Sequence, residues 1–363
     1  CGKCDKALSK HKCSCDERFC DNCFVWHQNR FPIHRKVGGK VERAWKWATG
    51  KIGAVADGLS VKHVFEQDEG AKWFGLHIEE NSRGVRVAGI VETHRFSSLA
   101  EKSIHASSES PSRQFPNLIS FVGDTGSGKS TLIRSLIWCS AQSKGEDDVD
   151  KFDAPVPCLS SGAEAMTSTT GEVNLYSDPA TFGTGEPRFY VDCEGTLAIE
   201  PMASRYQDKW HRTGRQYTFE TVDGKDIDRE TAVQKIYPRF LYISSDVICL
   251  VTRNPRSRVN TVLTLLEWSE AGAHHTVNQY ALPAAVIVLN APPIEDERWV
   301  SDDLDALTDD FFKQVDKELK ENKKLRKKAK KKGDETMKEL ISRNFSSIHV
   351  HYIPDSKWGR CST

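Results

Sequence analysis

A glycine-rich stretch near the middle of the chain has the residue types and spacing of a phosphate-binding loop. Gly123, Gly128, Lys129 and Ser130 stand at the spacing G-x-x-x-x-G-K-S. Glycines let main-chain N–H groups close around phosphate oxygens, where a side chain would clash. The lysine would reach the outer phosphates and the serine hydroxyl would bind Mg²⁺. The stretch therefore predicts a site for a nucleotide and a magnesium ion.

The neighbouring sequence supports this interpretation. An apolar run at 118–122 predicts a buried strand before the glycines, and apolar spacing over 131–139 predicts a helix after them, whose N-terminus adds a partial positive charge. The alternative is a glycine turn that arose by chance, and the strand–loop–helix context favours the phosphate-binding loop over it. We expect the nucleotide to be bound by Gly123, Asp124, Thr125, Gly126, Ser127, Gly128, Lys129, Ser130 and Thr131.

A second motif, D-x-x-G, follows an apolar strand predicted at 189–191. It consists of Asp192 and Gly195. A carboxylate at this place would hold Mg²⁺ through a water molecule, and the Gly195 amide would contact the third phosphate. An ordinary turn at a strand end can have the same pattern. The interpretation as a nucleotide-binding motif therefore depends on its position downstream of the glycine loop.

The two motifs, with a threonine-rich segment between them, resemble the P-loop GTPases of the translation-factor-related class. The long insertions resemble its large members, the dynamin and guanylate-binding-protein group, the very large inducible GTPases and large fungal proteins. The resemblance covers roughly 117–355. It implies slow GTP hydrolysis and nucleotide-dependent self-association as a homodimer. It also implies a catalytic role for Lys129 and for a loop threonine that binds Mg²⁺, with Thr170 as the first candidate and Thr169 as the second.

The sequence departs from that family in two places. Guanine recognition normally uses N-K-x-D, and here Asn290 matches while Glu295 and Asp296 are displaced. The expected preference for GTP over ATP therefore follows from the resemblance alone. Thr196 stands where a glutamine would orient water, so hydrolysis is slow, needs a partner, or is absent in a scaffold that only binds nucleotide. Six arginines near the motifs are interpreted as solvated residues: Arg205, Arg212, Arg215, Arg253, Arg256 and Arg258.

The N-terminus holds eight candidate zinc ligands in a short segment. Tetrahedral zinc sites use four cysteine or histidine ligands each, and clustered C-x2-C pairs rarely arise by chance. One ion would be held by Cys1, Cys4, Cys20 and Cys23, and the other by Cys13, Cys15, His27 and His34. Asp16 is an alternative to Cys15, and His11 is a spare ligand. The spacing resembles the B-box finger, which implies a protein partner; a RING-type ligase fits the short segment less well.

The remaining pattern predicts an α/β fold with a mainly parallel sheet preceded by a small cross-braced zinc module. We expect a zinc finger at 1–36, a linker at 37–112 with a helix over 41–60 and a β-hairpin, and a P-loop GTPase domain at 113–363. The hairpin would add to the edge of the nucleotide domain. Since the first residue is Cys1, we expect the chain to be a segment of a longer protein.

The charge balance favours no class of partner, because 51 basic and 51 acidic residues cancel. No apolar run reaches membrane-spanning length and the cysteine usage fits a reducing compartment, so we expect a cytoplasmic protein, with the nucleus left open. A basic run at 323–332 is most simply a solvated helical extension. Contact of that run with anionic lipid, nucleic acid or a nuclear import factor is the weaker alternative.

Overall fold

The computed structural model describes residues 11–12, 18–20, 22–25, 69–80, 86–107, 114–145, 153–155, 167–168, 170–196, 200–201, 215–219, 229–253, 258–273, 281–290, 298, 301, 303–321 and 336–353. The helix predicted over 41–60 and the basic run at 323–332 lie outside these residues.

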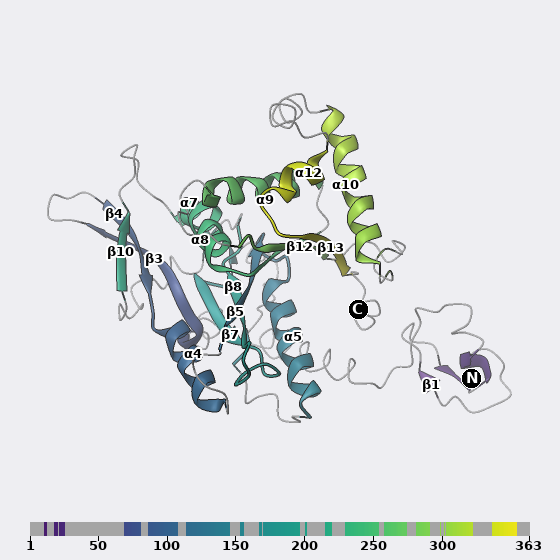
Figure 1. Ribbon diagram of the computed structural model, residues 1–363, viewed down its shortest axis with the longest axis horizontal. Helices are drawn as coiled ribbons and strands as arrows, with labels where there is room; N and C mark the ends of the chain where they lie inside the picture. The colour runs from purple at the N-terminus through teal and green to yellow at the C-terminus, as the bar shows by residue number, and fades with distance from the viewer. Residues whose placement is uncertain are drawn as a thin grey trace.

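A mixed sheet is the centre of the described part of the chain (Figure 1). Its nine strands are β3 Lys72–Glu80, β4 Arg86–Glu92, β5 Asn117–Gly123, β7 Val173–Ser177, β8 Arg188–Cys193, β10 Arg215–Phe219, β11 Val247–Arg253, β12 Ala284–Asn290 and β13 Ile348–Ile353. Their order in space is β10-β4-β3-β7-β8-β5-β11-β12-β13. The predicted α/β class is confirmed.

The prediction of a mainly parallel sheet is wrong for one half of it. The run β8-β5-β11-β12-β13 is parallel, but β7 pairs antiparallel with β8, and β3, β4 and β10 continue in antiparallel pairs. Short connections explain two of these antiparallel pairs, because residues 81–85 join β3 to β4 and residues 178–187 join β7 to β8. A parallel pair needs a crossover of a dozen or more residues.

The predicted β-hairpin is present and is continuous with the sheet. Strands β3 and β4 pair over seven residues, from Phe74 opposite Glu92 to Glu80 opposite Arg86. Strand β3 then pairs with β7, with a register shift between Lys72 and Phe74. The hairpin thus extends the sheet beyond β7, and the boundary proposed near residue 113 stays a prediction.

Helices flank the sheet, and two short strand pairs lie outside it. The helical elements are η1 Glu69–Ala71, α4 Arg95–Ala106, α5 Lys129–Ser143, α7 Arg229–Thr231, the π-helical η6 Ala232–Ile236, α8 Tyr237–Ser244, α9 Arg258–Ala273, α10 Leu304–Glu321 and α12 Met337–Ser342. The short strands are β1 His11–Lys12 with β2 Arg18–Phe19, and β6 Thr167–Ser168 with β9 Glu200–Pro201. Among the described helices, none combines the length and the apolar character needed to cross a membrane.

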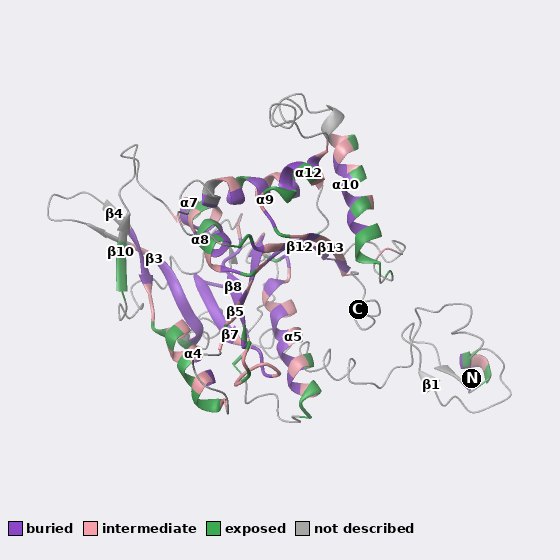
Figure 2. Ribbon diagram, viewed as in Figure 1, coloured by how far each residue is buried: buried purple, intermediate pink, exposed green. Residues whose placement is uncertain are grey.

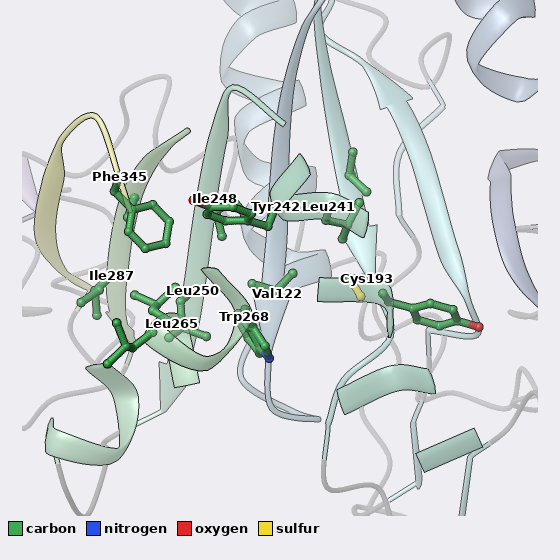
Figure 3. Packing of buried hydrophobic residues seen from close by; sticks show 14 of the residues in the cluster. Val122, Cys193, Leu241, Tyr242, Ile248, Leu250, Leu265, Trp268, Ile287 and Phe345 are labelled. Atoms are coloured by element: carbon green, nitrogen blue, oxygen red, sulfur yellow. The ribbon is translucent and has the colours of Figure 1, made fainter. Parts of the chain in front are cut away.

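The core has two parts because successive strand residues point to opposite faces of a sheet. On one face, Phe121 packs with Ile133 and Ile137 of α5. On the other face, Val122 and Leu250 point towards α9. Figure 3 shows them near Leu265 and Trp268 of that helix. In Figure 2, buried residues fill the central strands, and exposed residues are most frequent on α4 and α10.

The contact between α8 and α9 depends on a glycine. A Cβ at Gly272 would lie 2.4 Å from Cδ1 of Tyr242, a fully buried ring that cannot move aside. We expect Gly272→Ala to lower the free energy of unfolding by about 2 kcal/mol through overpacking. Urea unfolding measures this effect. Gly70→Ala is the matched control, since a Cβ there meets nothing within 4 Å; equal stability of the two variants would contradict the assignment.

Candidate functional site

The glycine loop between β5 and α5 has a backbone that requires glycine. Gly123, Gly126 and Gly128 have φ values of 137°, 73° and 96°, in the region that other residues rarely adopt. A Cβ on Gly123 would lie 2.0 Å from the Val251 carbonyl oxygen, and one on Gly128 would lie 2.5 Å from Nδ2 of Asn290. The loop therefore runs against β11 and β12 at a distance that side chains forbid.

Lys129 begins α5 and points its side chain back into the loop. Its Nζ donates to the carbonyl oxygens of Gly123 and Asp124 at 3.1 and 3.0 Å. Burial lowers the pKa of this ammonium below its ordinary value, and the nearby Asp192 carboxylate opposes that shift. The loop thus holds a desolvated cation, which favours an anionic ligand beside it.

Three residues from distant parts of the chain meet at the start of α5. The Ser130 hydroxyl donates to Oδ2 of Asp192 at 2.6 Å and lies 3.0 Å from Oγ1 of Thr170. Thr170 also donates to the same carboxylate oxygen at 3.4 Å. Strand periodicity explains the position of Asp192, because it shares the α5 face of β8 with Tyr190 while Val191 points to the opposite face. These are the residues predicted to bind Mg²⁺.

Several buried polar atoms at this place have no hydrogen-bond partner among the described residues. They are Oδ1 of Asp192, Oγ1 of Thr125 and Oγ of Ser127. Asp192 and Ser127 are each only 1% exposed. Buried polar atoms are normally satisfied, so several unsatisfied ones near one loop are typical of a ligand-binding place. A carboxylate and hydroxyls suit a hard cation such as Mg²⁺ and a phosphate group.

The D-x-x-G segment lies directly on the glycine loop. A Cβ on Gly195 would lie 2.6 Å from Cα and N of Thr125, so only glycine permits this approach. The Thr125 amide donates to the Thr196 carbonyl at 2.9 Å, and the Thr196 amide donates to the Gly123 carbonyl at 3.2 Å. The Thr196 hydroxyl also donates to Oδ1 of Asp124 at 2.8 Å. The two motifs are thus in direct contact with each other.

Asn290 ends β12 and braces the loop. Its Nδ2 donates to the Ser127 carbonyl at 2.6 Å. Strand periodicity again places it, since Val288 and Asn290 lie on the α5 face of β12. The contact supports the loop conformation. Glu295 and Asp296, the displaced candidates for guanine recognition, lie outside the described residues.

Sequence reasoning missed a group of buried polar residues beside the two motifs. Glu172 and Glu194 are buried, and Arg229 and Tyr237 contact them from α7 and α8. Asn174 is another missed residue, since it lies opposite Asp192 in the register of β7 and β8, and its Oδ1 is buried without a partner among the described residues. The only signal was the presence of acidic residues within apolar surroundings next to each motif.

The arginines considered from the sequence do not reach this site where the structure describes them. Arg215 is exposed on the edge strand β10, Arg253 is exposed at the end of β11, and Arg258 lies 3.8 Å from Glu318 on α10. Arg205, Arg212 and Arg256 lie outside the described residues, as does Thr169, the second candidate for the loop threonine. Arg229 is the arginine that contacts residues next to both motifs.

The zinc prediction falls mostly outside the described residues, where Cys1, Cys4, Cys13, Cys15, His27 and His34 lie. Cys20 is buried just after β2, and its carbonyl accepts the Phe24 amide at 2.9 Å, while Cys23 is partly exposed on the following helical turn. His11 lies on β1 opposite Phe19. Among the described residues, no group of three or more possible ligands surrounds a metal position.

The raised pKa of the buried Asp192 predicts how the stability of the ligand-free protein depends on pH. Burial raises the pKa of Asp192 from 3.8 to about 6, against the opposing effect of Lys129. The folded carboxyl therefore holds its proton more tightly than the unfolded one. Its contribution to stability is complete below about pH 4 and is lost as the pH rises through about 6.

Asp192→Asn cannot ionise, so the ligand-free variant should be more stable than the wild type at about pH 7.5. The expected gain is about 3 kcal/mol, because the pKa is raised by about two units and each unit corresponds to about 1.4 kcal/mol. The gain should shrink towards about pH 4. Denaturant unfolding at both pH values measures it. Asp305→Asn is the control, because that side chain is 92% exposed. A variant less stable than the wild type at both pH values would contradict this account.

Comparison with known proteins adds no family to these observations. No protein-family model matches the sequence, and no curated protein is similar enough to be compared with it.

Proposed function

We propose that this chain binds a nucleoside triphosphate with Mg²⁺, GTP in preference to ATP, and hydrolyses it to drive a conformational switch or self-assembly. The convergence of three separated motifs carries the proposal. Ser130 after the glycine loop, Thr170 between the motifs and Asp192 of D-x-x-G meet within hydrogen-bond distance, around a carboxylate with an unsatisfied oxygen. Because buried polar atoms are normally paired, the unpaired oxygen supports a ligand at this place.

Each residue has a role in this proposal. The glycine loop and Lys129 would hold the phosphates, and Ser130, Thr170 and Asp192 would hold the metal. A bound magnesium ion would neutralise charge that develops on the phosphate oxygens. The buried ammonium of Lys129 is held at the loop by main-chain carbonyls. Asp192 accepts hydrogen bonds from the hydroxyls of Ser130 and Thr170 and so orients them. We assign the parallel part of the sheet with α5 to a P-loop NTPase domain of the GTPase type.

GTP is the preferred ligand through the family resemblance, with ATP as the alternative. The Asn290 side chain holds the Ser127 carbonyl, as expected for the first residue of a base-recognition motif, but the Lys and Asp of N-K-x-D are absent. Competition between GTP and ATP for the protein distinguishes the two nucleotides. Preference for ATP would leave the phosphate site intact and change only the base that is recognised.

A second function, a scaffold that binds nucleotide without turnover, is favoured by one observation. Thr196 stands where a water-orienting glutamine is expected, and its hydroxyl is engaged by Asp124. Phosphate release measured at several protein concentrations separates the two functions. Turnover that rises with concentration supports a GTPase activated by a nucleotide-dependent homodimer, whereas absence of turnover at every concentration supports the scaffold.

The primary test removes the ammonium from the loop. Lys129→Ala should weaken binding of Mg²⁺-GTP by more than about 100-fold, because a desolvated cation facing the phosphates is lost. Isothermal titration calorimetry measures the affinity. Lys144→Ala is the matched control, since Lys144 is exposed at the other end of the same helix. Unchanged affinity in the Lys129 variant would refute the proposed site.

We also propose that the N-terminal segment is a two-zinc, B-box-like finger used for protein contacts. The support is the spacing of the cysteines and histidines, with Cys20 buried at the end of a short β-hairpin. Binding of the basic run at 323–332 to anionic lipid or nucleic acid is a weaker proposal, because only the charge of the run supports it.

Metal analysis of the purified chain should find about two zinc ions per molecule, as eight ligands require. Cys20→Ser should reduce the zinc content and unfold the finger, because metal binding supplies the folding energy of such modules. Cys139→Ser is the control, since Cys139 is exposed on α5. A wild-type content of one zinc ion or none would contradict the eight-ligand arrangement.

A further inference from the structure

Four side chains, three of them buried, connect the two loops that flank the candidate site. Arg229 donates from Nη1 to Oε1 of Glu172 at 2.8 Å and from Nε to Oε1 of Glu194 at 3.2 Å, with a second contact from Nη2 to Oε2 of Glu194. The Tyr237 hydroxyl donates to Glu172. Glu172 lies two residues after Thr170, and Glu194 lies directly before Gly195. One guanidinium therefore binds both loops.

Backbone contacts tie the two loops to each other as well. The Glu172 amide donates to Oε2 of Glu194 at 2.8 Å, and the Glu194 amide donates to the Glu172 carbonyl at 2.8 Å. Farther along, β6 and β9 pair in parallel, with Thr167 opposite Glu200. The loops are thus joined on both sides of Thr170, and a displacement of one loop must be shared by the other.

The electrostatics make Arg229 essential to this arrangement. The side chains of Glu172 and Glu194 are only 2% and 1% exposed, and that of Arg229 is 10% exposed. Burial raises the pKa of Glu194, and Arg229 opposes that shift. Burial alone would lower the pKa of Arg229, but the two carboxylates raise it. Without the guanidinium, two like charges would face each other in a buried space, which is strongly unfavourable.

Glu172 also has a strained backbone. Its φ is 65°, and no other described residue except glycines has a positive φ. Such conformations persist only where surrounding contacts hold them, and they are concentrated at functional sites. Here the contacts come from Arg229, Tyr237 and the Leu76 amide, which donates to Oε2 of Glu172 at 2.9 Å. The strained residue sits between Thr170 and the sheet, where it sets the direction of the loop.

From these contacts we infer that Arg229 is a positioning residue that locks the Thr170 and Gly195 loops into one unit, which responds to the third phosphate of the nucleotide. The inference rests on the proposed function. In the described contacts Arg229 touches neither the glycine loop nor the group of Ser130, Thr170 and Asp192. It therefore acts through Glu172 and Glu194. The third phosphate is singled out because Thr170 and Gly195 border its place, whereas the glycine loop holds the other two.

The test compares the affinity of Arg229→Met for a non-hydrolysable GTP analogue and for GDP, both with Mg²⁺, by calorimetry. The analogue should bind about tenfold more weakly, while the GDP affinity should stay within about twofold of the wild type, because only the third phosphate needs both loops. Arg188→Met is the matched control, since Arg188 is exposed at the start of β8. Equal losses for both nucleotides, or no loss, would overturn the inference.

A second measurement keeps the inference testable without nucleotide. Hydrogen exchange of the ligand-free protein should speed up together at 170–172 and 193–196 in Arg229→Met. Tyr237→Phe, which keeps the ring and removes one hydrogen bond to Glu172, should show a smaller effect in the same two segments. Faster exchange in one segment alone, or in neither, would overturn the positioning role.

The two measurements also separate this inference from the proposed function. A wild-type protein that binds neither nucleotide would refute the proposed function and the link to the third phosphate. The exchange data would then decide whether Arg229 joins the loops. A wild-type protein that binds both nucleotides, combined with unchanged discrimination in Arg229→Met, would refute the inference and leave the nucleotide site standing.

Discussion

The hydrogen bond from Ser130 to Asp192 is the interaction on which the candidate site depends, because it joins the start of α5 to the end of β8 at 2.6 Å. It brings together two motifs that are 62 residues apart, and Thr170 enters the same cluster from the intervening segment. The close approach at Gly195 and the brace from Asn290 keep the loop in the shape that this bond requires. The parallel strands supply the common edge at which all these residues arrive.

Charge balance is the second constraint. Asp192 and Lys129 share one buried space, and Glu172 and Glu194 share another with Arg229. In each space burial works against ionisation, and a partner of opposite charge works in its favour. The first space still has an unsatisfied carboxylate oxygen and two unsatisfied hydroxyls among the described residues, whereas every carboxylate in the second space has its partners. The first therefore has free acceptor capacity, as the proposed ligand site requires, and the second is saturated by its own contacts.

Much of the strand pattern could be predicted from the sequence, because apolar runs such as 118–122 and 284–289 form buried strands at those positions. The hairpin of β3 and β4 was predicted, but the place where it joins the sheet could not be, because that depends on pairing with β7, which is distant in the sequence. The loop, Asp192 and Gly195 were found from motif spacing. Arg229 was not, because nothing local marks it: its partners lie 35 and 57 residues away. The burial of the two glutamates, which is what requires a nearby cation, became visible only in the structure.

The π-helical η6 between Arg229 and Tyr237 has a geometric consequence. Trp268 of α9 donates from Nε1 to the Gln234 carbonyl at 3.0 Å and so anchors this wider turn. A π-helical turn accommodates one residue more than an α-helical turn, and each residue advances an α-helix by about 100°. Deleting one residue from η6 would let the helix tighten into a regular spiral and swing the guanidinium around its axis. The phase of this helix, as much as the identity of its residues, decides whether an arginine meets the two glutamates.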